Sequence, residues 1–331
     1  MSAHIRVEGL RKTYRIPERD AGMWGALRSV VHRRYRTVEA LSDVSFTLQR
    51  GELLGFIGPN GAGKSTTIKI LSGILRPDGG LCEVDGLTPW RSRIAHVARI
   101  GVVFGQRTQL FWDLPVREGF GLLRSIYRVP EASYRRTEAE LVELLRIEPL
   151  LDQPVRLLSL GQRMRCELAA SMLHEPSLLF LDEPTIGLDA PSKLAVREFI
   201  QRLNRERGVT VLLTTHDMHD IEALAQRVIV IGHGRLLSDG SFEQLRAKVL
   251  HERLLVIDFA DVVPSLAIEG ATERAREGRR LTLAFDPTRI TAPSLIARIA
   301  ASYEVEDVHV EQPRIEQVIS RFYDQLGAVE A

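Results

Sequence analysis

The nine residues Gly58 to Thr66, which read G-P-N-G-A-G-K-S-T, decide the fold of this chain. They match the pattern G-x-x-x-x-G-K-[ST], a P-loop, in which backbone N–H groups and the start of the following helix bind a polyphosphate. Its glycines permit backbone conformations and close approaches that a β-carbon would block. We expect Lys64 to bridge two phosphates and the Ser65 hydroxyl to ligate Mg²⁺. The predicted nucleotide-binding residues are Gly58, Pro59, Asn60, Gly61, Ala62, Gly63, Lys64, Ser65 and Thr66.

The residues on either side of this loop have the pattern that a P-loop requires. Glu52 to Ile57 is an apolar run typical of a buried strand, and Ser65 to Leu75 carries apolar residues at helical spacing. A strand, a glycine-rich loop and a helix follow one another in the expected order. A chance glycine-rich turn with a neighbouring Lys-Ser pair is therefore disfavoured.

Length and composition bound the possible classes of protein. The chain has 331 residues, of which 44% are apolar, enough for one large domain and a small one. Its 44 basic and 43 acidic residues leave a formal charge of +1. This balance gives no overall attraction to nucleic acid, so no nucleic-acid partner is expected.

The cysteines and the hydropathy pattern indicate the compartment. Cys82 and Cys166 lie far apart in the sequence, which argues against a disulfide framework and suits a reducing cytosol. We interpret both as small buried hydrophobic residues rather than reactive thiols. The sequence contains no run of about 18 apolar residues and no signal-peptide pattern at its start. We therefore expect that the chain itself does not span a membrane.

The N-terminal region is predicted to contain two strands separated by an insertion. His4 to Glu8 alternates like an edge strand that ends near Leu10, and Val38 to Gln49 alternates again. Residues 17–37 between them contain an apolar helical stripe in basic surroundings, so an inserted amphipathic helix is expected. It could lie on an acidic membrane surface, close over the nucleotide, or pack on the domain as a short helix.

Further strands alternate with helices, which predicts an α/β fold with a parallel central sheet. The predicted strands are Ile100–Phe104, Leu178–Glu183 and Val209–Thr215. Ligands of such sheets bind at the carboxyl ends of the strands. Four polar residues follow strands on the side that the P-loop occupies, namely Gln106, Asp182, Glu183 and His216.

The domain organisation follows from changes in the pattern along the chain. Residues 107–158 have few strand patterns and Glu131 to Ile147 reads as a helix; with the helix that opens at Leu158, this predicts a helical subdomain over 107–170. The large domain is expected to end near residue 250. Residues 251–331 read as a small α/β accessory domain with strands at Leu254–Phe259 and Leu281–Phe285 and a terminal helix opened by Pro313.

The ordered set of motifs resembles the ATP-binding subunits of ABC transporters. After the P-loop come Gln106, Leu158-Ser-Leu-Gly-Gln162, Asp182-Glu183, Asp189 and His216, and the resemblance covers about residues 4–245. The sequence between Gly105 and Asp189 resembles that of the branch of this family that is paired with ABC-2-type permeases. That branch includes drug-resistance, sodium-efflux and viologen-exporter-like ATPases. The resemblance implies a P-loop NTPase fold of the ABC-ATPase type, with ATP and Mg²⁺ bound.

The resemblance also implies roles for the residues at the strand ends. Asp182 would hold Mg²⁺ together with Ser65 and Gln106, and Gln106 would also sense the γ-phosphate. Glu183 resembles the general base that polarises the attacking water, and His216 the residue that positions base and phosphate. Phosphoryl transfer mostly needs positioning and charge compensation, so these roles are chemically reasonable.

The signature motif of the family corresponds to Ser159, Leu160, Gly161 and Gln162. In this family it caps the γ-phosphate of ATP held by a partner subunit, so one P-loop and one signature per chain imply a head-to-tail dimer. Asp189 would communicate across that dimer. Leu160 stands where the usual signature has glycine.

Two tyrosines are candidates for stacking on adenine, as an aromatic residue does in this family. Tyr14 lies in the usual Lys-x-Tyr context, whereas Tyr35 has the usual spacing before Gly58. Tyr35 is favoured slightly, and Tyr14 remains the alternative. Either ring could instead cover a sheet edge.

The sequence therefore predicts an ATPase subunit that drives export through separate ABC-2-type permeases, held at the inner face of the cell membrane by those permeases. Phe111, Trp112 and Leu114 are candidates for receiving a permease helix. One alternative is an import ATPase with a regulatory C-terminal domain. The other is a soluble ABC-type ATPase acting on ribosomes or DNA, which the single cassette, the lack of long heptads and the balanced charge disfavour.

Overall fold

The computed structural model describes residues 3–18, 34–105, 107–215, 217–249, 253–263 and 268–311. The chain divides into two compact units, Met1–Gly240 and Ser241–Ala331. The first unit contains the P-loop and all the motifs named above.

A parallel sheet forms the centre of the first unit, which confirms the predicted α/β class. Its strands lie in the order β5-β6-β7-β3-β8-β9. Neighbouring strands from β5 through to β8 run parallel. They are short apolar runs buried on both faces, as parallel sheets require. The bounds are β3 Leu53–Ile57, β5 Ile100–Phe104, β6 Leu178–Asp182, β7 Thr210–Thr214, β8 Arg227–Gly232 and β9 Arg235–Ser241.

A second, three-stranded antiparallel sheet has the order β2-β1-β4. Its strands are β1 Ile5–Glu18, β2 Arg34–Leu48 and β4 Gly79–Val84. The prediction of an edge strand that ends near Leu10 was wrong, because β1 is the central strand and continues to Glu18. Alternation of apolar and polar residues only indicates that one face of a strand is exposed. It cannot distinguish a central strand from an edge strand, because this depends on partner strands that lie far away in the sequence.

The long β1–β2 ladder also corrects the bounds of the predicted insertion. Pro17 pairs with Tyr35 and Glu18 with Arg34, so both ends of the 17–37 segment belong to strands. The amphipathic helix predicted within it, around Met23 and Trp24, lies outside the described residues.

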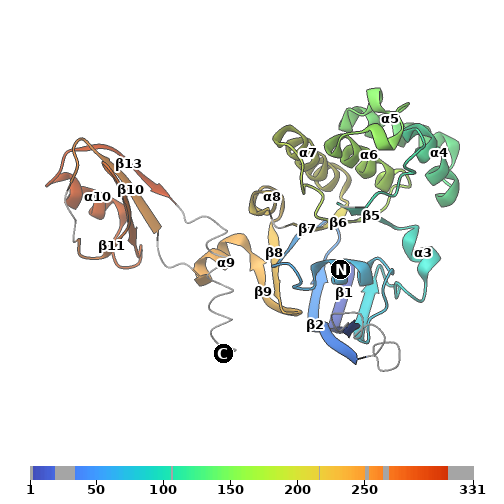
Figure 1. Ribbon diagram of the computed structural model, residues 1–331, viewed down its shortest axis with the longest axis horizontal. Coiled ribbons are helices and arrows are strands. Elements are labelled where there is room, and N and C mark those ends of the chain that lie inside the picture. Colours follow the sequence, from blue (N-terminus) through green and yellow to red (C-terminus); the bar gives the residue numbers. More distant parts are fainter. Residues whose placement is uncertain are drawn as a thin grey trace, which may run out of the picture. The chain divides into compact units, whose positions relative to one another are not determined.

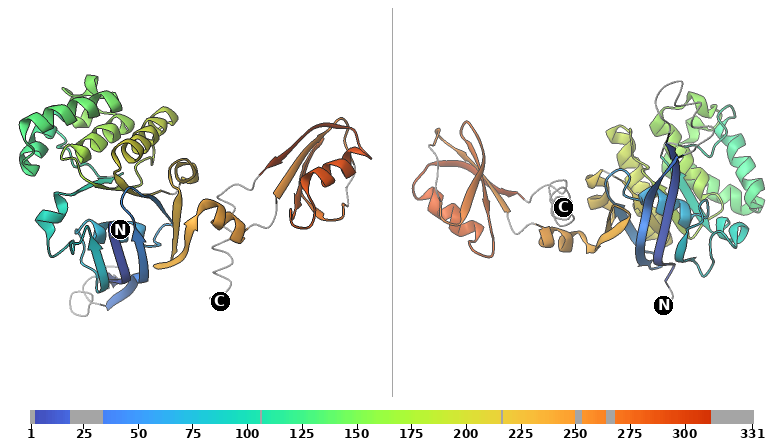
Figure 2. Two further views of the ribbon diagram at one scale, coloured as in Figure 1. Left: turned by 180° about the vertical axis from the view of Figure 1, so that it is seen from behind. Right: turned by 60° about the horizontal axis from the view of Figure 1, so that its bottom comes forward.

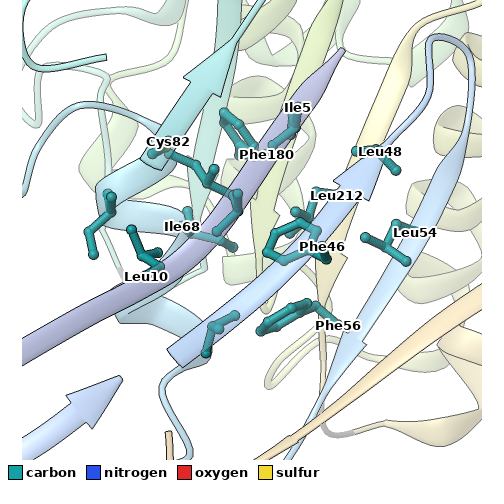
Figure 3. Packing of buried hydrophobic residues seen from close by; sticks show 14 of the residues in the cluster. Ile5, Leu10, Phe46, Leu48, Leu54, Phe56, Ile68, Cys82, Phe180 and Leu212 are labelled. Carbon is teal, nitrogen blue, oxygen red and sulfur yellow. The ribbon is translucent and has the colours of Figure 1, made fainter. Parts of the chain in front are cut away.

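A hydrophobic core joins the two sheets (Figure 3). Phe46 of β2 and Phe56 of β3 face each other there with ring centroids 5.7 Å apart. Cys82 is fully buried in this core, and Cys166 is buried elsewhere in the same unit. Burial raises the pKa of both thiols to about 12, so both remain protonated and act as small hydrophobic residues.

Helices α4 to α6 form a group of their own, on the far side of the parallel sheet from β1 and β2 (Figures 1 and 2). Two short 3₁₀ turns, Glu148–Leu150 and Val155–Leu157, connect α5 to α6. The helices of this unit are α2 Lys64–Leu71, α3 Arg93–Val97, α4 Val116–Tyr127, α5 Glu131–Leu145, α6 Leu160–Met172, α7 Ala190–Arg207 and α8 Met218–Leu224. The P-loop helix α2 is shorter than expected and ends at Leu71, shortly before Gly73, whose φ is 74°.

The second unit begins with α9 Phe242–Val249 and contains an antiparallel sheet of order β11-β12-β10-β13. Its other elements are β10 Arg253–Phe259, β11 Ala271–Glu277, β12 Arg280–Phe285, α10 Ala292–Ala300 and β13 Val305–Glu311. Helix α10 lies against one face of this sheet (Figure 2). Its Leu295 and Ile299 are buried in the hydrophobic core together with apolar residues of β10 and β12. The helix expected after Pro313 lies outside the described residues, and the sequence-based domain boundaries remain a prediction.

Among the described residues, no helix has both the length and the apolar character needed to cross a bilayer.

Candidate nucleotide site

The ends of four neighbouring strands are aligned at one edge of the parallel sheet. Phe104 of β5 pairs with Asp182 of β6, Asp182 pairs with Thr214 of β7, and Thr214 pairs with Phe56 of β3. The residues that follow these positions therefore leave the sheet side by side. Gln106 and His216 lie outside the described residues, but each comes two residues after an aligned strand end.

The P-loop folds back on its own lysine. Gly63 caps α2 in a left-handed conformation with φ 109°, which its lack of a β-carbon permits. Lys64, only 5% exposed, donates hydrogen bonds from Nζ to the carbonyl oxygens of Gly58 (2.7 Å) and Pro59 (3.1 Å). Burial lowers the pKa of Lys64, while the negative charges of Glu183 and Asp182 act in the opposite direction. The ammonium group is thus held inside the loop that is expected to wrap the phosphates.

Asp182 accepts hydrogen bonds from hydroxyl groups of two neighbouring elements. Its Oδ1 accepts hydrogen bonds from the Thr214 hydroxyl at 2.6 Å and from the Ser65 hydroxyl at 3.2 Å. A carboxylate and a hydroxyl oxygen at the start of the P-loop helix are the hard oxygen ligands that Mg²⁺ prefers. The residues present therefore fit a Mg²⁺ ion accompanying nucleotide.

Glu183, the residue after the end of β6, adopts a left-handed backbone conformation with φ 56°. Its N–H donates to the carbonyl oxygen and the hydroxyl of Thr214, at 2.9 and 3.2 Å. The backbone of Gly105 packs closely against Glu183 from the side opposite Thr214. A β-carbon at Gly105 would lie 2.2 Å from the Glu183 carbonyl oxygen. Non-glycine residues with positive φ are uncommon. Where the surrounding segments of the same chain hold such a residue in place, it is often part of a functional site.

A buried ion-pair network, which sequence analysis did not identify, holds the residues that follow β6 and β7 in place. Asp220 of α8 is fully buried and pairs with Arg197 of α7, whose Nε lies 2.6 Å from Oδ1. The other carboxylate oxygen accepts hydrogen bonds from the hydroxyls of Thr185 and Thr215. Arg197 lies one helical turn after Lys193, which pairs with Asp217. This pattern was visible in sequence only as charges at helical spacing, which are typical of a solvated face.

The signature residues form the beginning of α6. Ser159 caps the helix in a capping box, in which its hydroxyl accepts from the Gln162 N–H and the Gln162 side chain accepts from the Ser159 N–H. A β-carbon at position 161 would lie 2.3 Å from the hydroxyl oxygen of Ser192 on α7. The α6 backbone therefore contacts α7 closely at Gly161.

Leu160 is accommodated where a glycine was expected. It is only partly buried, and its Cδ2 would lie 3.0 Å from a β-carbon at Gly187. The close contact between α6 and α7 thus favours glycine at position 161, and the side chain of Leu160 lies beside Gly187, whose φ of 69° itself favours glycine. Asp189, two residues further on, caps α7 by accepting a hydrogen bond from the Ser192 N–H at 3.2 Å.

The two candidate tyrosines lie in the same β1–β2 ladder. Tyr14 pairs with Val38 and Tyr35 with Pro17. Tyr35 is 52% exposed, and the ring of Tyr14 has the Lys12 ammonium 5.8 Å from its centroid. The choice between them remains a prediction.

Part of the segment predicted to meet a permease is exposed. Phe111 and Trp112 are about half exposed, whereas Leu114 is partly buried. The guanidinium of Arg163 on α6 lies 5.5 Å from the centre of the Trp112 ring.

Comparison with known proteins identifies the family. The profile described as "ABC transporter" matches residues 41–186. The daunorubicin resistance ATP-binding protein DrrA3 of Streptomyces coeruleorubidus is 34% identical over 86% of this chain and 92% of its own length. The Nod factor export ATP-binding protein I of Ralstonia nicotianae is 36% identical over 67% of this chain and 68% of its own length.

A solved ATP-binding subunit of an ABC transporter has a TM-score of 0.61 and 27% identity, covering 74% of this chain and 92% of that one. The chain therefore belongs to the family of ABC transporter ATP-binding proteins. It has the P-loop NTPase fold of this family, as predicted, and is an ATPase.

Proposed function

We propose that this chain is the ATPase subunit of an exporter, in which two copies bind ATP between them and drive separate ABC-2-type permease subunits. The observation that carries the proposal is the alignment of Phe104, Asp182, Thr214 and Phe56 at one sheet edge. This alignment supports the proposal because the ends of β5, β6 and β7 lie at the same end of the sheet as the end of β3, which leads into the P-loop.

In this proposal the P-loop amides and Lys64 hold the β- and γ-phosphates of ATP. Glu183 accepts a proton from the attacking water, and its fixed backbone aims the carboxylate at the γ-phosphate. His216 and Gln106, from the adjacent strand ends, position the phosphate and the water. The left-handed φ of 56° at Glu183, secured by Thr214, supports a role in which orientation matters more than flexibility.

Ser65, Asp182 and Gln106 would hold Mg²⁺, which neutralises charge on the β- and γ-phosphate oxygens when bound. The 3.2 Å contact between the Ser65 hydroxyl and Asp182 supports this assignment. Thr214 donates to the same Asp182 oxygen and so fixes the direction in which the carboxylate points.

The second half of each site comes from the other copy. Each chain has one P-loop and one signature turn, Ser159–Gln162. The exposed start of α6 presents backbone N–H groups and the positive end of a helix, which suit the γ-phosphate of ATP bound by a partner. A head-to-tail dimer with two sites uses both features of both chains, and Asp189 would lie at the contact between them.

Export through ABC-2-type permeases is favoured by the names of the relatives, one of which is an export ATP-binding protein and another a resistance protein. The permease subunits of this chain's own transporter would hold it at the inner face of the membrane. The exposed Phe111 and Trp112 offer an apolar contact for a permease helix. Co-purification from membranes with identification of the integral partners tests this part, since permeases of an import system would contradict it.

The ATPase part of the proposal is tested with Glu183→Gln. The variant keeps its shape but cannot accept the proton, so we expect ATP binding without turnover and a stable ATP-bound dimer in size-exclusion chromatography. Undiminished turnover would remove Glu183 from the role of base, and a variant that binds ATP but stays monomeric would contradict the shared site.

A further inference from the structure

Strand β13 forms an open edge of the sheet in the second unit. Within the described residues the strand order β11-β12-β10-β13 gives it a neighbour on one side only. Open edges can pair with another chain, and proteins usually protect them with bulges, prolines or lysines. The other edge strand, β11, has a bulge between Glu273 and Ala275 and an ion pair between Glu273 and Arg276. In β13, residues 307–311 are in unbroken register with β10 and contain neither proline nor lysine; the irregularity in this ladder lies before Asp307.

The hydrogen bonds of β10 show which backbone groups of β13 face the open edge. The Phe259 N–H donates to the carbonyl oxygen of Arg279, on the β12 side, at 3.0 Å. Successive residues of a strand direct their backbone groups to opposite sides, so the even-numbered residues of β10 direct theirs to β13. Their partners are the odd-numbered residues of β13 from 307 to 311. The backbone groups of Val308 and Val310 therefore point away from β10, toward the open edge.

At this edge a side chain takes the place of a neighbouring strand. The Val308 N–H donates to Oδ1 of Asp307, the residue before it, at 2.8 Å. Such a local bond satisfies a backbone donor that a neighbouring strand would otherwise use. Val310 is 39% exposed. The edge thus offers backbone groups and partly exposed valines to an incoming strand.

We propose that β13 pairs with β13 of a second copy, antiparallel and centred on Val308, so that two four-stranded sheets join into one. A two-fold axis perpendicular to the sheet produces this arrangement. Because β13 spans Val305–Glu311, a centre at Val308 pairs the whole strand with its copy. Val308 then exchanges both backbone hydrogen bonds with Val308 of the second copy, since both of its backbone groups point outward. The contact lies within the second unit and needs no nucleotide, so it is separate from the ATP-bound dimer proposed above.

The polar side chains of the strand fit this register. Asp307 of each copy faces His309 of the other, at a non-hydrogen-bonded position where side chains approach most closely. The Val308 N–H takes a backbone partner, which frees the Asp307 carboxylate to accept a hydrogen bond from the imidazole. A centre at His309 instead places Asp307 opposite Glu311, and a centre at Asp307 places two aspartates opposite each other. Like charges directly opposite are destabilising, so these two registers are disfavoured.

Crosslinking of single cysteines in the full chain, without nucleotide, tests the pairing and its register. Val308→Cys places two thiols on directly opposite residues, with Cα atoms about 5.5 Å apart. Val310→Cys is the matched control, because it changes a valine of the same edge whose counterpart lies about 14 Å away, four residues along the strand. A short bifunctional thiol reagent spans the first distance but not the second. Cys82 and Cys166 are buried with pKa values raised to about 12, so they do not react.

We expect Val308→Cys to crosslink at least about tenfold faster than Val310→Cys, because only the first pair lies on neighbouring strands at the same level. Adding Asp307→Lys places a cation opposite His309 and should slow the Val308→Cys reaction about fivefold, since the two-fold axis repeats the pair. Adding His309→Asp as well restores a complementary pair and should restore the rate.

Equal rates at the two positions, a faster reaction at Val310→Cys, or no recovery in the exchanged variant would each overturn the inference. These outcomes are independent of the proposed function, because the reaction needs no ATP. A Glu183→Gln chain that stays monomeric with ATP would contradict the shared ATP site and leave the crosslinking at Val308→Cys unchanged.

Discussion

The buried network around Asp220 makes a prediction about stability that separates it from the surface ion pairs. Asp220→Ala would leave the Arg197 guanidinium, whose side chain is 19% exposed, without its carboxylate and would leave two buried threonine hydroxyls without an acceptor. Removing one partner of a buried pair costs about 3–5 kcal/mol. Asp220→Asn keeps the shape but removes the charge and replaces one acceptor oxygen by an N–H₂ donor, so we expect a smaller loss of about 1.5–3 kcal/mol, the contribution of hydrogen bonds to a charged group.

Urea unfolding followed by tryptophan fluorescence measures these values. The three tryptophans, Trp24, Trp90 and Trp112, all belong to the Met1–Gly240 unit, so their signal reports on that unit alone. Glu206→Ala is the matched control, because it removes a carboxylate from the exposed Arg202–Glu206 pair, with side chains 55% and 60% exposed. Such exposed pairs contribute about 0–1 kcal/mol. An Asp220→Ala loss no larger than that of the control would refute the stabilising role of the network.

Two further predictions concern the signature and the histidines. Gly161→Ala should force α6 away from Ser192, cost about 1–3 kcal/mol of unfolding free energy and lower ATP turnover, whereas Leu160→Gly should retain turnover. Stability should also fall as the pH drops below about 6.5, because burial lowers the pKa of His4, His96 and His174 and the unfolded chain then binds more protons. Urea unfolding at several pH values should show that the free energy of unfolding changes by up to about 1.4 kcal/mol per pH unit for each histidine. His96→Gln should reduce this dependence on pH. A free energy of unfolding that is constant through this range would contradict the lowered pKa of these histidines.

The sequence was most informative where chemistry requires particular residues in a particular order. The strand before Gly58, the helix after it and the strand ending at Asp182 follow from local apolar patterns, and their common edge follows from the general behaviour of parallel sheets. The small buried cysteines were predictable because nothing near Cys82 or Cys166 suggested a reactive thiol.

Features that depend on distant partners could not be predicted. The central position of β1 depends on pairing with β4, some 70 residues later, and alternation carries no information about it. Strands β11 and β13 were missed because most of their residues are exposed and polar. Asp220 and Glu167 are charged residues on helices, which are usually solvated; only the folded chain shows that other elements bury them.

The composite site is the central claim, and mixing two inactive variants tests it most directly. Lys64→Met disables the P-loop, and Ser159→Asp keeps the helix cap but places a negative charge against the partner's phosphate. In a head-to-tail dimer of one copy of each, one site combines both defects and the other combines both intact halves. An equal mixture should therefore recover about a quarter of the wild-type ATP turnover if the sites act independently, since half the dimers are mixed and half of their sites are intact. A mixture no more active than the separate variants would contradict a site shared between two chains.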